Sequence, residues 1–392
     1  MAWERFLAGL SAAWIWILSI FVHWGWVSNN LAVQPTVFLA EDEYQIVWET
    51  ERPSSAWVTV GGAVFTDNKA GNLVMDQTVH KVRVPMEALN AAGGYEISWQ
   101  HILKTDNAFA YIRKGNHKAA QYAFRAPDFS DGIQIFHLSD THSNLQPGAK
   151  TARYWGDKLD LLILNGDILN DIYYASSRNF ALKLAWEITG GARPVLYTKG
   201  NHETRGVQAN ADMERYLGTP GGDRWYFTTR VGSLWIAVFD CGELREDEFY
   251  ADRGYFDEYR ARQTIFFEQV AANAANEYEA PGVEHRLLVS HQPFMRPNGY
   301  YTDLKLQWAA LADQMHFDLA LAGHDHTVGY YPIGNTSGGV TLTYPLIIGS
   351  RPAHIESANG VFIAAPVEFR DGRITAWFTD QNYTVSRTLN IR

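Results

Sequence analysis

Five short polar motifs, each directly after a run of apolar residues, constrain the fold of this chain more than any other feature. In chain order they are Asp140-Thr141-His142, Gly166-Asp167, Gly200-Asn201-His202-Glu203, His291 and Gly323-His324-Asp325-His326. The apolar runs before them, among them "DLLILN", "HRLLVS" and "FDLALA", are typical of strands covered on both faces. Because open α/β sheets bind ligands at the carboxyl ends of their strands, we expect the motifs to meet at one sheet edge.

The donor atoms of these motifs are oxygen and nitrogen, with no sulfur. They number about eight, a set that suits two hard-to-borderline divalent metal ions a few ångströms apart. A single motif of this kind is a weak signal, because Asp, Asn and His often cap helices or end turns. Residues 114–117 repeat the letters Lys-Gly-Asn-His of residues 199–202, yet there we expect only a Gly-Asn hairpin turn between two strands. The predicted metal site therefore depends on all five motifs together.

Charge and cysteine content restrict the classes of function. The 392 residues carry a formal net charge of −10 and no block of Lys or Arg. Such a surface repels a phosphate-rich polymer on average, which argues against long nucleic acid as the main substrate. The single cysteine, Cys241, rules out an internal disulfide and a cysteine-based zinc site. Its place at the end of an apolar run predicts a small buried residue rather than a reactive thiol.

Residues 1–28 form a hydrophobic segment that we expect to be helical. Residues 6–27 contain no Asp, Glu, Lys or Arg, and this is about the length that spans a bilayer. Arg5 precedes the segment and the next Lys or Arg is Arg52, so the rest of the chain would face outward. A single apolar stripe fits equally a helix that packs on the protein or lies in a membrane interface. We predict membrane contact through residues 1–28, and a membrane-associated or extracytoplasmic location rather than a cytoplasmic one.

The remaining chain divides by pattern into residues 29–127 and residues 128–392. The first part consists of short segments rich in Val, Tyr and Trp, which predict a small all-β sandwich. Within it, Leu89 followed by Gly94-Tyr95 resembles the tyrosine corner of fibronectin type III domains, where a Tyr hydroxyl caps a strand crossover. In the second part, apolar strands alternate with helical stretches, which predicts an α/β domain that carries all five motifs.

The motif order Asp-x-His, Gly-Asp, Gly-Asn-His-Asp/Glu, His, Gly-His-x-His resembles that of the calcineurin-like metallophosphoesterase superfamily. The resemblance covers about residues 133–380, and every ligand position is filled. It implies an α/β fold of four layers, with two mixed β-sheets packed face to face and flanked by helices. It also implies hydrolysis of phosphomonoesters or phosphodiesters, with a small phosphate ester as the substrate. A β-sandwich like that predicted for residues 29–127 also precedes the catalytic domain of purple acid phosphatases.

The resemblance assigns a role to each motif position. It implies two divalent metal ions, whose identity among Mn, Fe, Zn, Co and Ni the sequence leaves open. One ion would be held by Asp140, His142 and His326, and the other by Asn201, His291 and His324. Asp167 would bridge the two ions. His202 would act with Asn201 in catalysis, not as a ligand but as the general acid that donates a proton to the leaving oxygen.

Residues near the motifs show which subfamilies the chain does not match. Purple acid phosphatases have a Tyr where Asn170 stands and no His at the position of His142, so an iron–tyrosinate site is not expected here. Protein Ser/Thr phosphatases have an Asp at the position of Asn170, where it orients the catalytic His. Asn170 could accept a hydrogen bond there but brings no charge, and Asp171 could partly take the place of that Asp. Glu203 is expected to hydrogen-bond groups around the ligands, and Arg205 either contacts phosphate or lies in solvent.

An alternative of a different class is a catalytically inactive protein of this fold that binds a partner through its β-sandwich. Inactive members usually lose metal ligands, and none is missing here, so the hydrolase is preferred.

Overall fold

The computed structural model describes residues 10, 13–14, 17, 29–105, 112–174, 177–209, 213–221, 223–250, 254–297, 300–350 and 360–392. The predicted hydrophobic helix of residues 1–28 therefore lies outside the described residues, apart from four positions. These four, Leu10, Ala13, Trp14 and Ile17, are helical and exposed. No helix within the described part of the chain has the length and apolar character needed to cross a bilayer.

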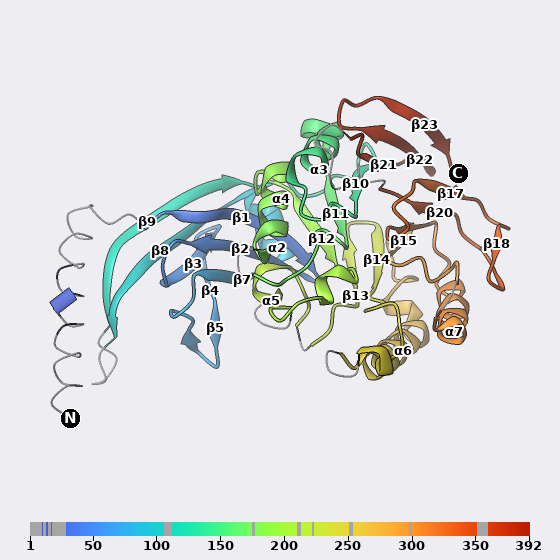
Figure 1. The fold of residues 1–392 in the computed structure, drawn as a ribbon. Helices are drawn as coiled ribbons and strands as arrows, with labels where there is room; N and C mark the ends of the chain where they lie inside the picture. Colours follow the sequence, from blue (N-terminus) through green and yellow to red (C-terminus); the bar gives the residue numbers. More distant parts are fainter. Residues whose placement is uncertain are drawn as a thin grey trace.

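The core of the molecule is a pair of mixed β-sheets (Figure 1). The larger sheet has nine strands, in the order β23 (Val385–Asn390), β22 (Arg373–Asp380), β21 (Ile363–Arg370), β10 (Ile133–Leu138), β11 (Leu161–Asn165), β12 (Pro194–Thr198), β1 (Leu31–Ala40), β2 (Glu43–Thr50) and β7 (Val79–Pro85). The second sheet has the order β13 (Phe227–Val231), β14 (Leu234–Phe239), β15 (His285–Ser290), β16 (Leu319–Ala322), β20 (Leu346–Ile348) and β17 (Gly329–Tyr331). Strands β10, β11 and β12 run parallel, as do β14, β15, β16 and β20.

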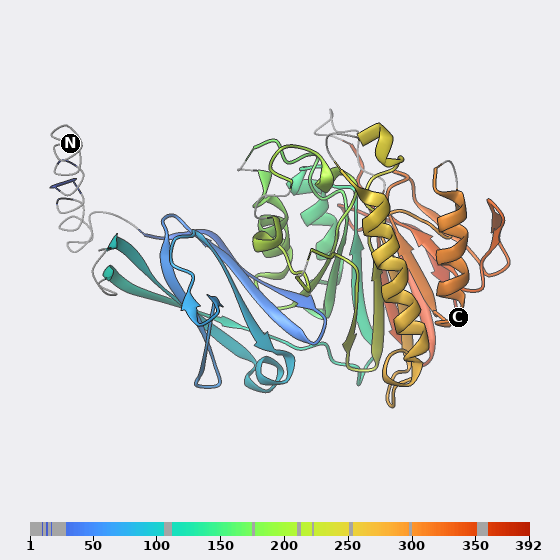
Figure 2. The same cartoon turned by 90° about the horizontal axis from the view of Figure 1, so that it is seen from below.

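The two sheets pack face to face and are covered by helices on their outer faces (Figure 2). Between the sheets, Ile135 and Ile163 of the larger sheet share one apolar cluster with Ile236 and Val289 of the smaller. The outer face of the larger sheet is covered by α3 (Leu145–Ala152) and α4 (Phe180–Thr189), and that of the smaller by α6 (Phe256–Ala272) and α7 (Thr302–Asp313). Strands that are apolar on both faces thus lie in the middle of four layers, which confirms the predicted fold class.

An all-β region precedes this core, also as predicted. Its own sheet has the order β4 (Ala63–Thr66), β3 (Ser54–Val60), β8 (Gly94–Thr105) and β9 (Ile112–Ala123). Val58 and Ile97 of this sheet pack in one cluster with Tyr44 and Ile46 of β2. The partner layer, however, is the edge of the nine-stranded sheet, because β1 pairs parallel with β12 along residues 37–39. The boundary expected after residue 127 falls between β9 and β10, yet strands from both sides of it share one sheet.

The other elements among the described residues are short. They are α2 (Met86–Ala92), α5 (Met213–Tyr216), the two-stranded pairs β5 (Asn68–Lys69) with β6 (Asn72–Leu73) and β18 (Thr336–Ser337) with β19 (Val340–Thr341), and the 3-10 helices η1 (Arg153–Lys158), η3 (His202–Thr204), η4 (Asp247–Tyr250) and η5 (Ala274–Asn276).

Two local predictions in the all-β region are wrong. The hydroxyl of Tyr95 donates a hydrogen bond across to the carbonyl of Gly191, 3.0 Å away beyond the end of α4, so it forms no tyrosine corner. The likeness to fibronectin type III domains is therefore not supported. Residues 114–117 form no hairpin turn either, because they lie inside β9 at an irregularity of its pairing with β8. His117 stacks there on Trp57, far in the fold from the five motifs.

Candidate metal centre

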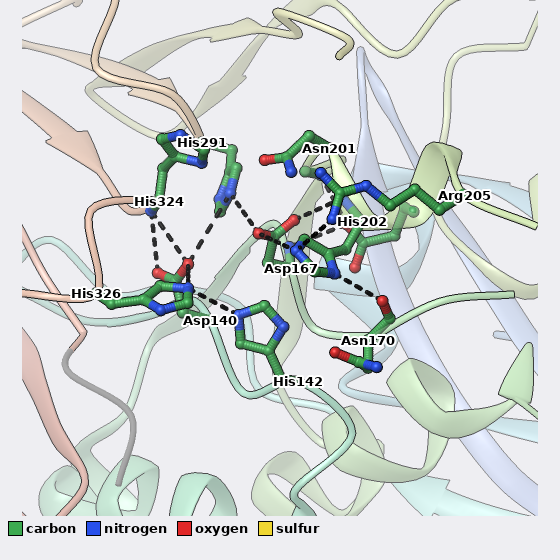
Figure 3. A network of polar contacts seen from close by, with 12 residues as sticks. Asp140, His142, Asp167, Asn170, Asn201, His202, Arg205, His291, His324 and His326 are labelled. Atoms are coloured by element: carbon green, nitrogen blue, oxygen red, sulfur yellow. Dashed lines mark hydrogen bonds and ion pairs between the residues drawn. The ribbon is translucent and has the colours of Figure 1, made fainter. Parts of the chain in front are cut away.

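The five motifs meet where five strands end (Figure 3). Asp140, Asp167 and Asn201 follow β10, β11 and β12 of the larger sheet, whereas His291 and His324 follow β15 and β16 of the smaller. The chain turns sharply at these points, and several of the motif residues have left-handed backbone conformations that cost side chains of this type energy. They are Asp140 (φ 54°), His142 (45°), Asp167 (49°), His324 (73°) and His326 (52°).

The side chains form two groups of potential ligands that share one carboxylate. In one group are Asp140, His142, Asp167 and His326, and in the other Asp167, His291 and His324; within each group the donor atoms all lie within 4.8 Å of one another. The Nε2 atoms of His142 and His326 are 2.9 Å apart, and His291 Nε2 lies 3.1 Å from Asp167 Oδ2. Six of the seven ligands that the sequence assigned therefore fall in these groups, and Asp167 belongs to both; Asn201, the seventh, is in neither group.

The site fits divalent cations in its donor set and in its unsatisfied atoms. The carboxylates of Asp140 and Asp167 are buried, and buried charges require opposite charges nearby. The Oδ1 atom of Asn201 is buried without a hydrogen-bond partner among the described residues, and Nε2 of His291 faces the Asp167 carboxylate. Oxygen and imidazole nitrogen donors of this kind suit borderline divalent metals.

Ionisation within the site shows the same need for a cation. Burial, with the nearby Asp167, raises the pKa of Asp140 to about 7. Burial alone would lower the pKa of His291, but the carboxylates of Asp167 and Asp140 raise it to about 10. Burial acts to raise the pKa of Asp167 as well, but the charged His291 outweighs this and holds it below its usual range. The two acids thus retain a proton on His291, and a bound metal ion would take the place of that proton.

Other imidazoles of the site are already in the form that binds metal. Burial lowers the pKa of His142 to about 4 and that of His324 to about 3, so both rings are neutral at physiological pH. His291 Nδ1 lies 2.7 Å from the carbonyl oxygen of Asn165 and donates to it, which directs Nε2 toward the two carboxylates.

Glu203 joins the loops that carry the ligands. Its carboxylate accepts hydrogen bonds of 2.9 Å from the backbone N–H groups of Asp167, Leu169 and Gly200. The side chain is buried, so it contacts the protein around the ligands, in the manner expected from the sequence, and holds the ends of β11 and β12 together.

His202 lies at the rim of the site and is held at both ring nitrogens. Its Nδ1 atom lies 2.6 Å from the carbonyl oxygen of Asn170 and donates to it, and its Nε2 atom lies 2.8 Å from Arg205 Nη1. Asn170 thus contacts His202 through its backbone, and its side-chain amide instead donates to Asp171 at 3.1 Å. Asp171 accepts that bond and one from the backbone N–H of Tyr173.

Glu243 is a residue of this network that the sequence analysis missed. Its Oε1 atom lies 2.7 Å from Arg205 Nε, and its side chain is only 3% exposed. Glu243 comes from the loop after β14, so the ion pair joins the two sheets. The signal that finds the five motifs could have found it as well, because "DCGE" also follows an apolar strand, "LWIAVF". Cys241 in the same loop is buried, and burial raises the pKa of its thiol to about 11, as expected for an inert cysteine.

Comparison with known proteins agrees with this geometry. The sequence model of the family described as calcineurin-like phosphoesterase matches residues 133–328, which is half of the chain. Two similar solved structures are purple acid phosphatase PPD1 from yellow lupin (Lupinus luteus) seeds and PhoD. The first is 13% identical with a TM-score of 0.57, over 92% of this chain and 74% of that one. PhoD is 11% identical with a TM-score of 0.53, over 93% and 90%.

At these identities the two structures show a shared fold, including the β-rich region that precedes the phosphoesterase domain. A search of curated proteins gave no match. The motifs, the fold and the family match agree. The chain belongs to the calcineurin-like phosphoesterases, a family of phosphoester hydrolases, and this membership implies divalent metal ions at this site.

Proposed function

We propose that this protein hydrolyses small phosphate esters at a centre of two divalent metal ions. The observation that carries the proposal is the shared carboxylate, because Asp167 belongs to both groups of potential ligands and one side chain then fixes the spacing of the two ions. Asp140, His142 and His326 would hold one ion. Asn201, His291 and His324 would hold the other. The Oδ1 atom of Asn201, which has no hydrogen-bond partner in the described part of the chain, supports its place in that set.

When bound, the two ions would offset the charge of a phosphate ester and lower the pKa of a water molecule. The protein has to position the ester and supply a proton to the leaving oxygen. His202 is the proposed proton donor, since its Nδ1–H bond to the Asn170 carbonyl leaves Nε2 directed toward the site, 3.9 Å from Asp167 Oδ2. Charge that builds on the leaving oxygen is then neutralised by a proton from Nε2.

Arg205 is the second residue at the rim of the site with a proposed part in the reaction. A guanidinium group only donates hydrogen bonds, so Nε2 of His202 accepts from Arg205 in the arrangement observed. A phosphate oxygen is a better acceptor for Arg205 than a neutral imidazole, because the bond then joins opposite charges. We infer that the bound ester takes over the Arg205 contact, so that Nε2 of His202 is free to take up a proton from water and pass it to the leaving oxygen. Glu243 keeps the guanidinium in reach of both positions.

The proposal is tested by metal analysis of the pure protein together with turnover of p-nitrophenyl phosphate and its bis-ester. We expect about two equivalents of metal and hydrolysis of at least one ester. A pure, folded protein that takes up no metal and cleaves neither ester would overturn the proposal and favour the inactive binding protein. A panel of nucleotides, sugar phosphates, cyclic nucleotides and phospholipid head-group esters would then separate monoester from diester substrates.

A further inference from the structure

A cavity of about 850 Å³ lies away from the metal centre, between the all-β region and α5. Its walls come from residues 64–69, which span most of β4 and all of β5, from Gln77, from β7 and from Glu214 and Arg215 of α5. None of the proposed metal ligands lines it. The cavity is therefore separate from the proposed reaction and needs its own explanation.

The walls carry more positive than negative charge, in a protein whose net charge is −10. Four cationic side chains, those of Lys69, Lys81, Arg83 and Arg215, face two acidic ones, those of Asp67 and Glu214. Two of the cations are in ion pairs. Arg215 Nη2 lies 3.0 Å from Asp67 Oδ2, and Arg83 Nη1 lies 2.6 Å from Oε1 of Glu43, which is outside the cavity. The cavity thus keeps an excess of positive charge.

Lys81 has a charged group that is buried in the wall of this cavity. Its Nζ atom is buried and has no hydrogen-bond partner among the described residues. A buried ammonium group without a partner is unstable unless an anion compensates it. Neutral donors line the same walls, namely the amides of Asn68 and Gln77 and the hydroxyl of Thr66. Together these groups place several N–H and O–H donors and a spare positive charge in the walls of one open cavity.

We propose that this cavity is a binding site for a compact oxyanion, a phosphate or sulfate group, with the Lys81 ammonium as its main partner. The group is either a free ion or part of a small phosphorylated molecule, for whose apolar part Val64 and Phe65 provide a wall. The site needs no metal, and it differs from the metal centre in that its contacts are ammonium, guanidinium and amide groups.

The site is expected to take up protons when it binds. Burial lowers the pKa of Lys81 to about 7, Glu214 and Asp67 act to raise it, and Arg83 and Arg215 lower it further. About half of the Lys81 side chains are then neutral at pH 7, whereas an anion binds the ammonium form. Binding therefore draws a proton from solution, and affinity falls about tenfold per pH unit above pH 8.

Isothermal titration calorimetry with sodium sulfate tests the site, because sulfate does not ionise in this range. The titrations use the metal-loaded protein at pH 7 in two buffers of different ionisation enthalpy. Wild type should bind with a buffer-dependent enthalpy that reports proton uptake. Lys81→Met should weaken this binding at least tenfold and remove the buffer dependence. Lys118→Met is the matched control and should bind sulfate as wild type does. Lys118 lies on β9 and donates an exposed hydrogen bond to Asn30.

Phenylphosphonate, whose P–C bond is not hydrolysed, distinguishes the two sources of the anion. If phenylphosphonate binds at least tenfold more tightly than inorganic phosphate, and Lys81→Met loses this binding, the site takes a phosphorylated molecule. If the two compounds bind equally tightly, the site takes the free ion. Turnover by Lys81→Met should equal that of wild type, which also shows that the variant folds.

Should Lys81→Met fail to fold, Lys69→Met decides the matter, because Lys69 is exposed at the same cavity. It should weaken sulfate binding several-fold. The proposal is overturned if Lys81→Met binds sulfate as tightly as wild type does. It is equally overturned if wild type takes up no proton and Lys69→Met changes nothing.

Discussion

Nε2 of His202 lies 2.8 Å from Nη1 of Arg205, while the opposite nitrogen of the same ring donates to the backbone of Asn170. The imidazole is therefore fixed between the loop after β11 and the end of η3, at the rim of the metal centre. Because the ring is held in place, its proposed role as proton donor can be tested by comparing substrates with different leaving groups.

His202→Ala should slow hydrolysis of an alkyl phosphate by about 10²- to 10⁴-fold, with the metal content unchanged. An alkoxide needs a proton as it leaves, whereas p-nitrophenolate is stable without one, so the loss should be much smaller for p-nitrophenyl phosphate. The check is kcat on the two substrates with metal analysis of the same samples. Equal losses on both substrates would show that His202 is not the acid.

Arg205→Met should reduce kcat/KM by roughly 10²-fold, because the ester loses a charge-assisted hydrogen bond. Glu243→Gln should reduce it by about tenfold, mainly through KM, since Glu243 only positions the guanidinium. In the double variant the two losses should not add, because the second change removes nothing that still acts. Glu187→Gln is the matched control, as it breaks the exposed ion pair with Arg153 and should leave both constants unchanged. Additive losses would show that Glu243 acts independently of Arg205.

Removal of the metal should destabilise the fold as well as stop the reaction. A cation that binds the native chain alone, at 100 to 1,000 times its Kd, adds about 3–4 kcal/mol to the free energy of unfolding. Chelation should therefore lower the thermal midpoint of wild type. Asp167→Asn should lose metal and show no further effect of the chelator, whereas Asp171→Asn, outside both ligand groups, should respond as wild type does. A midpoint of wild type that ignores the chelator would contradict the proposed centre.

The candidate site could be predicted from the sequence because its information is local. Each ligand motif stands directly after an apolar strand, and parallel strands of a covered sheet bring their carboxyl ends to one edge. Asp140 and His326 are 186 positions apart in the chain, but each could be placed from its own few neighbours. Glu243 also follows an apolar strand, but that signal does not assign its role, because its loop matches no ligand spacing and its partner Arg205 lies across the two sheets.

The parts that could not be predicted are set by contacts distant in the chain. Nothing near Val37 indicates that β1 pairs with β12, since an apolar strand pairs equally well in a separate sandwich. The Tyr95 hydroxyl needed an acceptor, but the sequence does not show that this acceptor is Gly191. Gly115-Asn116 has the letters of a hairpin turn, and its pairing with β8 places it within a strand instead.

The shared sheet predicts that residues 128–392 do not fold well alone. A chain that starts at residue 128 lacks β1 and leaves the edge of β12, with its unpaired N–H and C=O groups, open to other chains. Because β12 leads directly to Asn201, metal binding should fail as well. We expect aggregation of this fragment, measured by light scattering, whereas deletion of residues 1–28 alone keeps β1 and should leave turnover intact. A monomeric, active 128–392 fragment would show that the two regions are independent.

His80 should make the fold sensitive to acid independently of the metal centre. Its side chain is fully buried beside Trp48, with Nε2 3.1 Å from the Thr50 hydroxyl. Burial, helped by the charge of Arg215, lowers the pKa of His80 to about 3, whereas the unfolded chain has an imidazole pKa of about 6.5. Above pH 6.5 the ring is neutral in both states and contributes no pH dependence. Below it only the unfolded chain binds the proton, so stability falls by about 1.4 kcal/mol per pH unit down to about pH 3.

Urea unfolding of wild type and His80→Gln between pH 8 and pH 4 measures this contribution. The variant is expected to be less stable at pH 8 by about 1–3 kcal/mol, since it disturbs a buried hydrogen bond, but to lose stability with acid less steeply than wild type. Thr50→Val is the control, because it removes the hydroxyl partner and keeps the imidazole. It should lower stability at every pH and retain the wild-type slope. If His80→Gln and wild type lose stability in parallel from pH 6.5 to pH 4, the buried imidazole is not a source of the acid sensitivity.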